Sequence, residues 1–497
     1  MVMRSYGLSG SGMDIDQIVK DMMAARRIQY DKVWQKKTQL EWKKVDYNTM
    51  YTSLQDFRSS KVFNFKLQST LMPKAVSSTA ENTVSATANA DAANVSHAIN
   101  VTQLAEGARM TSSDSLGSAA LKDTLRSQFN LDGSVPSTFD IVLGNGTSTQ
   151  KITVDTTKSI NEFVSSINNS GLGIKANYDA NLDRFFIYST ESGADAKIEL
   201  SGFEGDETGR DLLVSTLKIG NSAAGKDALF DLDGMMNISQ SSNSFTISGV
   251  TYNLKAEGSA NIVVAADNEK AITTVKDFVN SYNELLSKIN GELKESKHST
   301  FLPLTSEQRR AMEESEIIEW DKKARSGMLR RDSDLQDAVS KMRNDISSPI
   351  SGLTGKYTSL ASIGITTGNY SEGGKLHIDE TKLKEALEAD PDVINKLFRA
   401  SGESPDQQGV ANRLYDTLKV SMDKISAVAG TSSAIEGDLN SSLAKKIRDY
   451  NDGLDRINDR LAMVEARYYK QFDAMESALN RLSQQSGWLA NMFSSGA

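Results

Sequence analysis

Apolar side chains recur at helical spacing along the C-terminal part of the chain. Their gaps are three or four residues and average about 3.6, the period of one face of an α-helix. Charged residues occupy most positions between them. The pattern predicts one long amphipathic helix, whose stripe needs a partner. The stripe consists of Leu439, Leu443, Ile447, Tyr450, Leu454, Ile457, Leu461, Val464, Tyr468, Phe472, Met475, Leu479 and Leu482.

The N-terminal segment carries a weaker stripe. Asp14 is placed to cap a helix that begins near Ile15. None of the six prolines lies in residues 1–72 or 406–497, so both ends are free to form unbroken helices. We expect these two helices to pair with each other rather than each to pack in a bundle of its own. The seven-residue repeat consists of Val33, Leu40, Tyr47 and Leu54.

The segment from residue 76 to 266 is rich in Gly, Ser, Thr, Asn and Asp, and its apolar residues alternate with polar ones. Alternation is typical of half-buried strands. It predicts two β-rich modules, one inserted in the other, with a short helix at 159–169. The predicted strands cover residues 139–143, 151–154, 174–178, 184–188, 198–200, 245–247, 250–254 and 262–264.

Helical spacing returns at residue 271. We expect helices at 271–289, 306–327, 334–346, 379–387 and 391–398, with a hairpin joining 363–365 to 376–378. The chain is thus predicted to be a multidomain α+β protein. Its long terminal helices pair into a coiled-coil or helix-bundle leg, and β-rich head modules are inserted in the middle of the chain. The expected domains are a terminal helical leg (1–45 with 455–497) and a helical-bundle domain with a small hairpin (46–75 with 268–454). They are followed by a β-rich head module (76–110 with 217–267) and a second β-rich module inserted in it (111–216).

Composition narrows the chemistry. The 497 residues predict roughly three or four domains at about 150 residues each. The net charge of −9 argues against a nucleic-acid partner. The chain has no cysteine and only three distant histidines, and its Asp231–Gly234 run lacks the later ligands of a calcium loop. We therefore expect no enzyme activity, no catalytic residue, no metal and no cofactor.

The two ends of the chain bear on its location and contacts. No apolar run is long enough to span a membrane, and the N-terminus lacks the apolar stretch of a secretory signal. Apolar residues gather near the C-terminus, beyond the polar residues 483–486. They could cover the end of their own bundle, but a contact with another molecule is favoured because a chain end is little covered.

Residues 7–19 (GLSGSGMDIDQIV) resemble the opening motif of the flagellar filament-cap family, also called hook-associated protein 2. The resemblance continues in order along the chain, and the block at 304–330 is similar to members from Gram-positive bacteria. Residues 111–216 contain no such motif. The other matching segments are residues 101–105, 277–285, 304–330, 363–379 and 468–489.

The resemblance implies a structural protein that caps the distal tip of the bacterial flagellar filament. Such a protein promotes the folding and insertion of exported flagellin and prevents its loss. Its implied partners are flagellin, the hook–filament junction proteins, an export chaperone and further copies of itself in a ring, usually a pentamer. It leaves the cell through the flagellar type III system without a cleaved signal peptide. The alternatives are a tip-exposed adhesin for mucus or host glycans, and a hook–filament junction protein or flagellin itself.

The resemblance also implies which surface matters. The terminal helices would contact the filament or a neighbouring subunit. The candidate partner-binding residues are Leu8, Ile15, Ile18, Val33, Leu40, Leu461, Val464, Tyr468, Phe472, Trp488, Leu489, Met492 and Phe493.

Overall fold

The computed structural model describes residues 14–117 and 124–494. The chain divides into two compact units. The helical unit comprises Met1–Leu71 and Ile272–Ala497, and the β unit comprises Met72–Ala271. The first and last parts of the chain therefore belong to one unit, with the β unit inserted between them in sequence.

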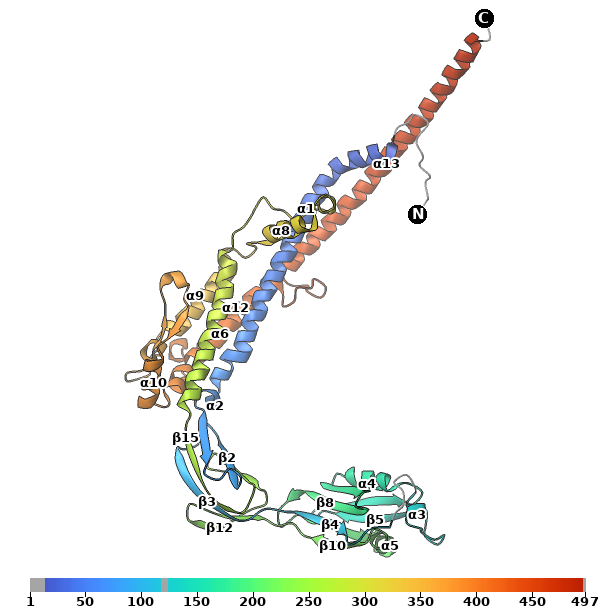
Figure 1. Ribbon diagram of the computed structural model, residues 1–497. Helices are drawn as coiled ribbons and strands as arrows, with labels where there is room; N and C mark the ends of the chain where they lie inside the picture. The colour runs from blue at the N-terminus through green and yellow to red at the C-terminus, as the bar shows by residue number, and fades with distance from the viewer. Residues whose placement is uncertain (1–13, 118–123, 495–497) are drawn as a thin grey trace. The chain divides into compact units, whose positions relative to one another are not determined.

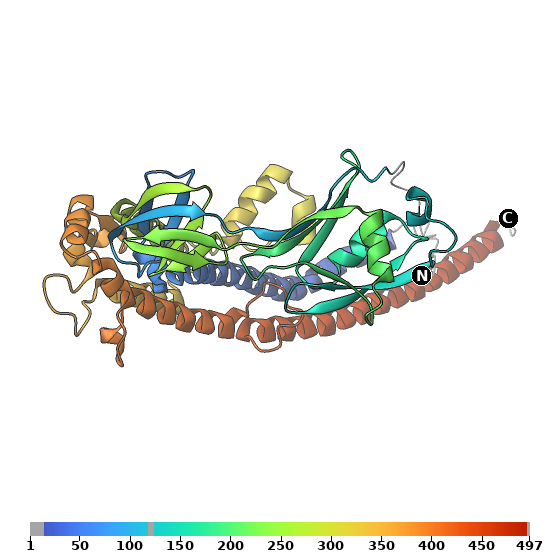
Figure 2. The same cartoon turned by 90° about the horizontal axis from the view of Figure 1, so that it is seen from below.

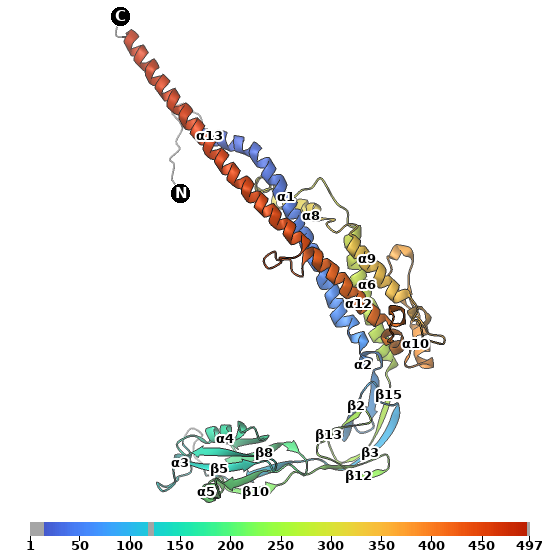
Figure 3. The same ribbon diagram turned by 180° about the vertical axis from the view of Figure 1, so that it is seen from behind.

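Two long helices, α1 (Ile15–Asp56) and α13 (Ser442–Ser494), lie side by side in the helical unit (Figures 1 and 3). The predicted pairing of the terminal helices is confirmed. Leu443, Ile447 and Leu454 of the predicted stripe are buried. Leu439, however, lies before α13 and is 69% exposed. The helix begins only after Ser441, whose hydroxyl accepts the backbone N–H of Ala444 at 3.2 Å.

The other helices of the unit pack beside α1. The helix α1 continues into a π-helical turn, and α12 packs against both α1 and α9. The apolar pattern of the sequence did not predict α12. The remaining helical elements are η1 (Phe57–Val62), η2 (Asn64–Lys66), α2 (Gln68–Leu71), α6 (Asn268–Lys294), α7 (Ser306–Arg310), α8 (Glu314–Arg325), α9 (Ser333–Ser347), η3 (Leu360–Ile363), η4 (Tyr370–Glu372), α10 (Glu380–Ala389), α11 (Val393–Arg399), η5 (Pro405–Gln407) and α12 (Val410–Ala429).

Aromatic rings fill the core where α1 ends. Phe278 of α6 packs on Phe65 and Phe398, at ring-centroid distances of 4.6 and 5.4 Å, and these two rings also contact each other at 4.9 Å. All three rings are buried, as is Phe57. Tilted and edge-on ring pairs at these distances are favourable beyond the area they bury. This cluster joins segments that are more than 300 residues apart in the chain.

The prediction of a single helix over residues 306–327 is wrong. Two helices, α7 and α8, occupy this stretch, and each begins with its own capping box, at Thr305 and at Glu313. The second box satisfies the free N–H groups at the start of a new helix, so one helix ends before Glu313 and another begins after it. The predicted hairpin is confirmed, because β16 (Ile365–Thr367) pairs antiparallel with β17 (Leu376–Ile378).

Leaving residues 118–123 aside, the β unit contains four antiparallel sheets, whose strand orders are β1-β15-β3-β11-β12, β13-β14-β2, β10-β4-β8-β7 and β6-β5-β9. The predicted strands are found, although β1 to β4 and β10 to β12 were not predicted. The strands are β1 (Lys74–Ser78), β2 (Val84–Ala88), β3 (Val95–Gln103), β4 (Gly107–Ser112), β5 (Thr138–Gly144), β6 (Thr149–Asp155), β7 (Ile174–Asp179), β8 (Arg184–Ser192), β9 (Glu199–Gly202), β10 (Ile219–Ala223), β11 (Ala228–Leu232), β12 (Met235–Gln240), β13 (Ser244–Ile247), β14 (Val250–Leu254) and β15 (Gly258–Ala266).

Two hydrophobic cores lie inside the β unit. One is built around Phe230, Tyr252 and Ile262 of the first two sheets. The other is built around Phe163 and Phe185, where α4 covers β7. The run proposed as a turn, Asp231–Gly234, does reverse the chain between β11 and β12. The three helices of the unit are α3 (Leu125–Gln128), α4 (Ile160–Asn168) and α5 (Thr208–Thr216).

Candidate functional site

The register of the terminal helices leaves the end of α13 beyond the first turn of α1. The hydroxyl of Tyr469 donates to Oδ1 of Asp16 at 3.0 Å, which fixes the two helices antiparallel at this level. Asp16 lies in the first turn of α1, whereas α13 continues to Ser494. Residues 470–494 extend for about 37 Å at about 1.5 Å per residue. Figures 1 and 2 show this segment projecting past α1.

Apolar side chains on this projecting segment are exposed. We call Met475, Leu479, Leu482, Trp488 and Leu489 the tip surface; their exposed fractions range from 38% for Met475 to 62% for Trp488. An exposed apolar row of this kind marks an interaction site. Full burial of a wholly exposed leucine or methionine is worth about 1.5–3 kcal/mol, and a partner would gain about half of that for each of these partly covered side chains.

The structure places the predicted partner-binding residues in two environments. Trp488 and Leu489 are exposed on the tip surface, and the others described are half-buried along the helix pair. Leu8 lies outside the described residues, as do the side chains of Met492 and Phe493. The half-buried residues are Ile15, Ile18, Val33, Leu40, Leu461, Val464, Tyr468 and Phe472.

Three members of the tip surface were missing from the predicted site. The sequence pattern assigned Met475, Leu479 and Leu482 only to the apolar stripe that faces a partner helix. A signal was present, because Met475, Leu482 and Leu489 recur every seven residues. A seven-residue apolar repeat predicts a seam that faces another chain segment. Its continuation past the start of α1 was visible only once the register was known.

The start of α1 is held by a side-chain cap. Oδ1 of Asp14 accepts the backbone N–H of Gln17 at 2.9 Å, as the sequence predicted. We expect Asp14→Ala to destabilise this end of the helix by about 1 kcal/mol, because it leaves that N–H without its acceptor. Faster amide hydrogen exchange at Gln17 and Ile18 would report the loss. Asp14→Asn keeps the cap and should exchange like the parent; equal exchange in all three proteins would contradict the prediction.

At its other end the helix pair is locked by a buried lysine. The Lys44 side chain is 1% exposed, and its Nζ donates to Oδ2 of Asp438 at 2.6 Å. The same ammonium group donates to the carbonyl oxygens of Ala429 at 2.6 Å and Ser432 at 2.8 Å. All three donors of the group are therefore used. The lock joins α1, the end of α12 and the loop that leads into α13.

The contact with Lys44 changes the pKa of the Asp438 carboxyl group. Burial by itself would raise its pKa, but hydrogen bonds from Lys44 and Ser441 outweigh burial and hold the pKa well below its usual range. Asp438 is therefore ionised at neutral pH and compensates the buried ammonium charge. A second anchor ties α1 to α9, where Tyr47 donates to Asp332. Burial and this carboxylate neighbour together raise the pKa of Tyr47.

The helix pair presents an apolar surface at one end and a buried ion pair at the other. In residues 14–117 and 124–494, no group of three or more potential ligands is placed to hold a metal ion. Among the helices of that same part of the chain, none is long and apolar enough to cross a membrane. What the helix pair offers is a rigidly anchored base and a projecting apolar end.

Comparisons with known proteins agree with this architecture. Two family models match: the flagellar hook-associated protein 2 N-terminus over residues 11–108 and its C-terminus over residues 225–484. A flagellar hook-associated protein 2 from Halalkalibacterium halodurans is 31% identical over 536 aligned residues, covering 99% of this chain and all of the relative. The chain belongs to the flagellar hook-associated protein 2 family. The resemblance seen in the sequence is thereby confirmed.

Two further comparisons have lower sequence identity. The protein of Escherichia coli K12 is 25% identical and covers 97% of both chains. In structure, the chain is similar to the D1-D2-D3 domains of the flagellar cap protein from Escherichia coli, with a TM-score of 0.54 at 20% identity. That likeness covers 77% of this chain and 99% of the other and supports the multidomain α+β fold. None of these comparisons supports the adhesin alternative.

Proposed function

We propose that this protein is the structural cap at the distal tip of the bacterial flagellar filament, with no enzymatic activity. Its membership of the hook-associated protein 2 family supports this role, as does its fold likeness to a protein described as a flagellar cap. The observation that carries the proposal is the tip surface. A helix anchored at its base and bearing exposed apolar side chains at its free end suits a leg that seats on a polymer.

In this proposal the tip surface and the half-buried row of the helix pair contact the filament or a neighbouring subunit. Several copies form a ring, which we propose to be a pentamer. A ring whose symmetry differs from that of the filament leaves one gap at a time for an arriving flagellin. Folding and packing of flagellin then drive each step, so the cap needs no nucleotide.

The cap works outside the cell. We propose that the chain leaves through the flagellar type III system, held beforehand by an export chaperone, and without a cleaved signal peptide. Its outer partners are flagellin and the hook–filament junction proteins. We also keep the division into four domains as a proposal; the two separate cores of the β unit support its innermost boundary.

The test is deletion of the gene in its source organism, followed by an assay of the medium for flagellin. An uncapped tip should release abundant unpolymerised flagellin and carry few or no filaments. Expression of the full chain from a plasmid should restore both. Normal filaments and a clean medium in the deletion strain would refute the capping role.

A further inference from the structure

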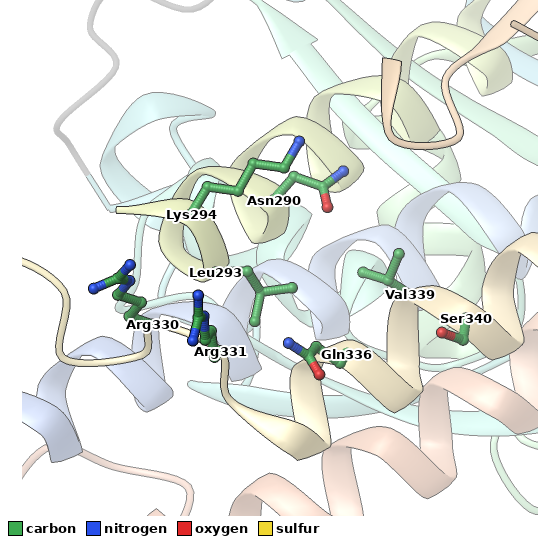
Figure 4. Close-up of a pocket in the computed structure, with 8 residues that line it drawn as sticks. All are labelled: Asn290, Leu293, Lys294, Arg330, Arg331, Gln336, Val339 and Ser340. Atoms are coloured by element: carbon green, nitrogen blue, oxygen red, sulfur yellow. The ribbon is translucent and has the colours of Figure 1, made fainter. Parts of the chain in front are cut away.

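A hollow of about 530 Å³ lies in the helical unit, away from the tip surface. It is formed by the last turn of α6, the turn before α9 and the first turns of α9. Figure 4 shows Leu293 near its centre, with Lys294 above and Arg330 and Arg331 to one side. Leu293 and Val339 supply apolar surface, and Gln336 adds an amide.

Three cations lie at this hollow, and none pairs with an anion among residues 14–117 and 124–494. No ion pair or side-chain hydrogen bond joins Lys294, Arg330 or Arg331 to another residue in the described part of the chain. Lys294 is explained in part by its place at the C-terminal end of α6, where a positive charge is favourable. The two arginines come just before the N-terminus of α9, where positive charge is unfavourable.

Within the described residues, the carboxylates close in sequence do not pair with these cations: Glu292 and Asp334 form no ion pair with them, and three others are engaged elsewhere. Glu295 accepts the backbone N–H of Gly327 at 2.5 Å. Asp332 caps α9 and accepts from Tyr47. Asp337 pairs with Lys341 at 3.1 Å and with Lys424 at 2.6 Å. The positive charge of the hollow is therefore not neutralised from within its own segment.

The turn that carries the two arginines is fixed by its backbone. The N–H of Arg331 donates to the carbonyl oxygen of Leu293 at 3.1 Å, and that of Asp332 donates to Leu329 at 3.1 Å. Arg331 has a φ of 55°, a left-handed conformation that glycine or asparagine adopts more easily than arginine. Arg331 is thus held against its backbone preference, on a turn that a backbone hydrogen bond ties to the end of α6.

We infer that this hollow binds an acidic segment of another protein chain through its carboxylates. Guanidinium groups match carboxylates in two-pronged hydrogen bonds. The half-buried side chain of Leu293 suits an apolar side chain between acidic ones, which a small inorganic anion does not have. The cations also lie on different sides of Leu293 rather than around one point (Figure 4). The site is independent of the capping role and of the tip surface.

The test is fluorescence anisotropy of the full chain with a fluorescein-labelled peptide of sequence EELEEL. We expect the triple variant Lys294→Gln, Arg330→Gln and Arg331→Gln to bind it at least tenfold more weakly. A matched control removes the same charges at exposed sites outside the hollow: Lys61→Gln, Arg310→Gln and Arg456→Gln. This control should change the affinity by less than twofold.

Two further arms make the result decisive. Circular dichroism must show that both triple variants are folded, and Arg330→Lys with Arg331→Asn provides a milder pair if the first variant unfolds. If the hollow variant and the control variant weakened binding equally, the proposed site would be overturned. Binding would then depend on the net charge of the protein and not on the position of the cations. Displacement of the peptide by inorganic phosphate, but not by sodium chloride of equal ionic strength, would show a small-anion site and overturn the protein partner.

Discussion

Replacing Lys44 with methionine is expected to lower the free energy of unfolding of the helical unit by about 3–5 kcal/mol at neutral pH. Methionine has a similar length and volume, so packing around α1 is largely kept. What is lost is the ammonium group that joins Asp438 to two carbonyl oxygens. Asp438 is then left as an uncompensated, largely buried carboxylate, which is the costly state of a broken ion pair.

The pH dependence of this effect has a definite sign. Because the pKa of Asp438 is held below its ordinary value of 3.8, the pair stabilises the fold fully above that pH. Its contribution is lost as the pH falls through the lowered pKa. In Lys44→Met the hydrogen bonds from Ser441 remain, but those of the ammonium group are gone and burial is offset less, so the pKa of Asp438 is higher than in the parent and the carboxylate takes up a proton earlier. The difference between parent and variant should therefore shrink as the pH falls below about 4.

Tryptophan fluorescence during urea unfolding measures this change selectively. All four tryptophans, Trp34, Trp42, Trp320 and Trp488, belong to the helical unit, so unfolding of the β unit does not enter the signal. Lys419→Met is the matched control, because Lys419 pairs with Asp423 at 2.8 Å but both side chains are more than 60% exposed. It should cost less than about 0.5 kcal/mol. Equal costs for the two variants would contradict a buried lock.

The sequence predicted the elements of the helix pair better than the contacts that hold them. The Asp14 cap and the long stripe of α13 are local patterns, so helical spacing and capping chemistry were enough to find them. Lys44 could not be found in this way. A lysine next to a seven-residue repeat reads as a solvated position, and its acceptors lie 385 to 394 residues further along the chain. Only the fold brings them together.

The predictions that were wrong or incomplete failed for a similar reason: they depended on contacts that spacing along the sequence does not show. The break between α7 and α8 depends on reciprocal hydrogen bonds at Glu313, in a stretch whose composition favours one continuous helix. Leu439 fits the stripe by spacing alone, but Ser441 and Asp438 organise a loop there. The tip surface was partly missed because spacing shows which face is apolar, whereas the register of α1 decides where that face is left uncovered.

Replacing Leu482 and Leu489 together with glutamine is expected to abolish filament growth while leaving the protein folded. Both side chains are at least half exposed, and glutamine forms helices about as well as leucine. The free energy of unfolding should change by no more than about 0.5 kcal/mol. Because Leu482 is 60% and Leu489 51% exposed, burial on the filament can cover only about half of each side chain, so the variant loses about 2–3 kcal/mol of contact per leg. That corresponds to roughly 30- to 150-fold weaker seating of each leg, which the several legs of a ring would compound.

The measurement is complementation of the deletion strain with plasmid-borne variants, scored by filament length and by soluble flagellin in the medium. Ile28→Gln with Met463→Gln is the matched control, because both are exposed apolar residues of the same helix pair but lie outside the tip surface. This control should restore filaments, as should Leu482→Met with Leu489→Met. Secretion of each variant is checked first, so that failed export is not taken for failed seating. Normal filaments from a secreted Leu482→Gln, Leu489→Gln protein would show that the leg seats by another surface. In that case the half-buried row along the helix pair, which would have to open to make contact, becomes the place where flagellin and cap meet.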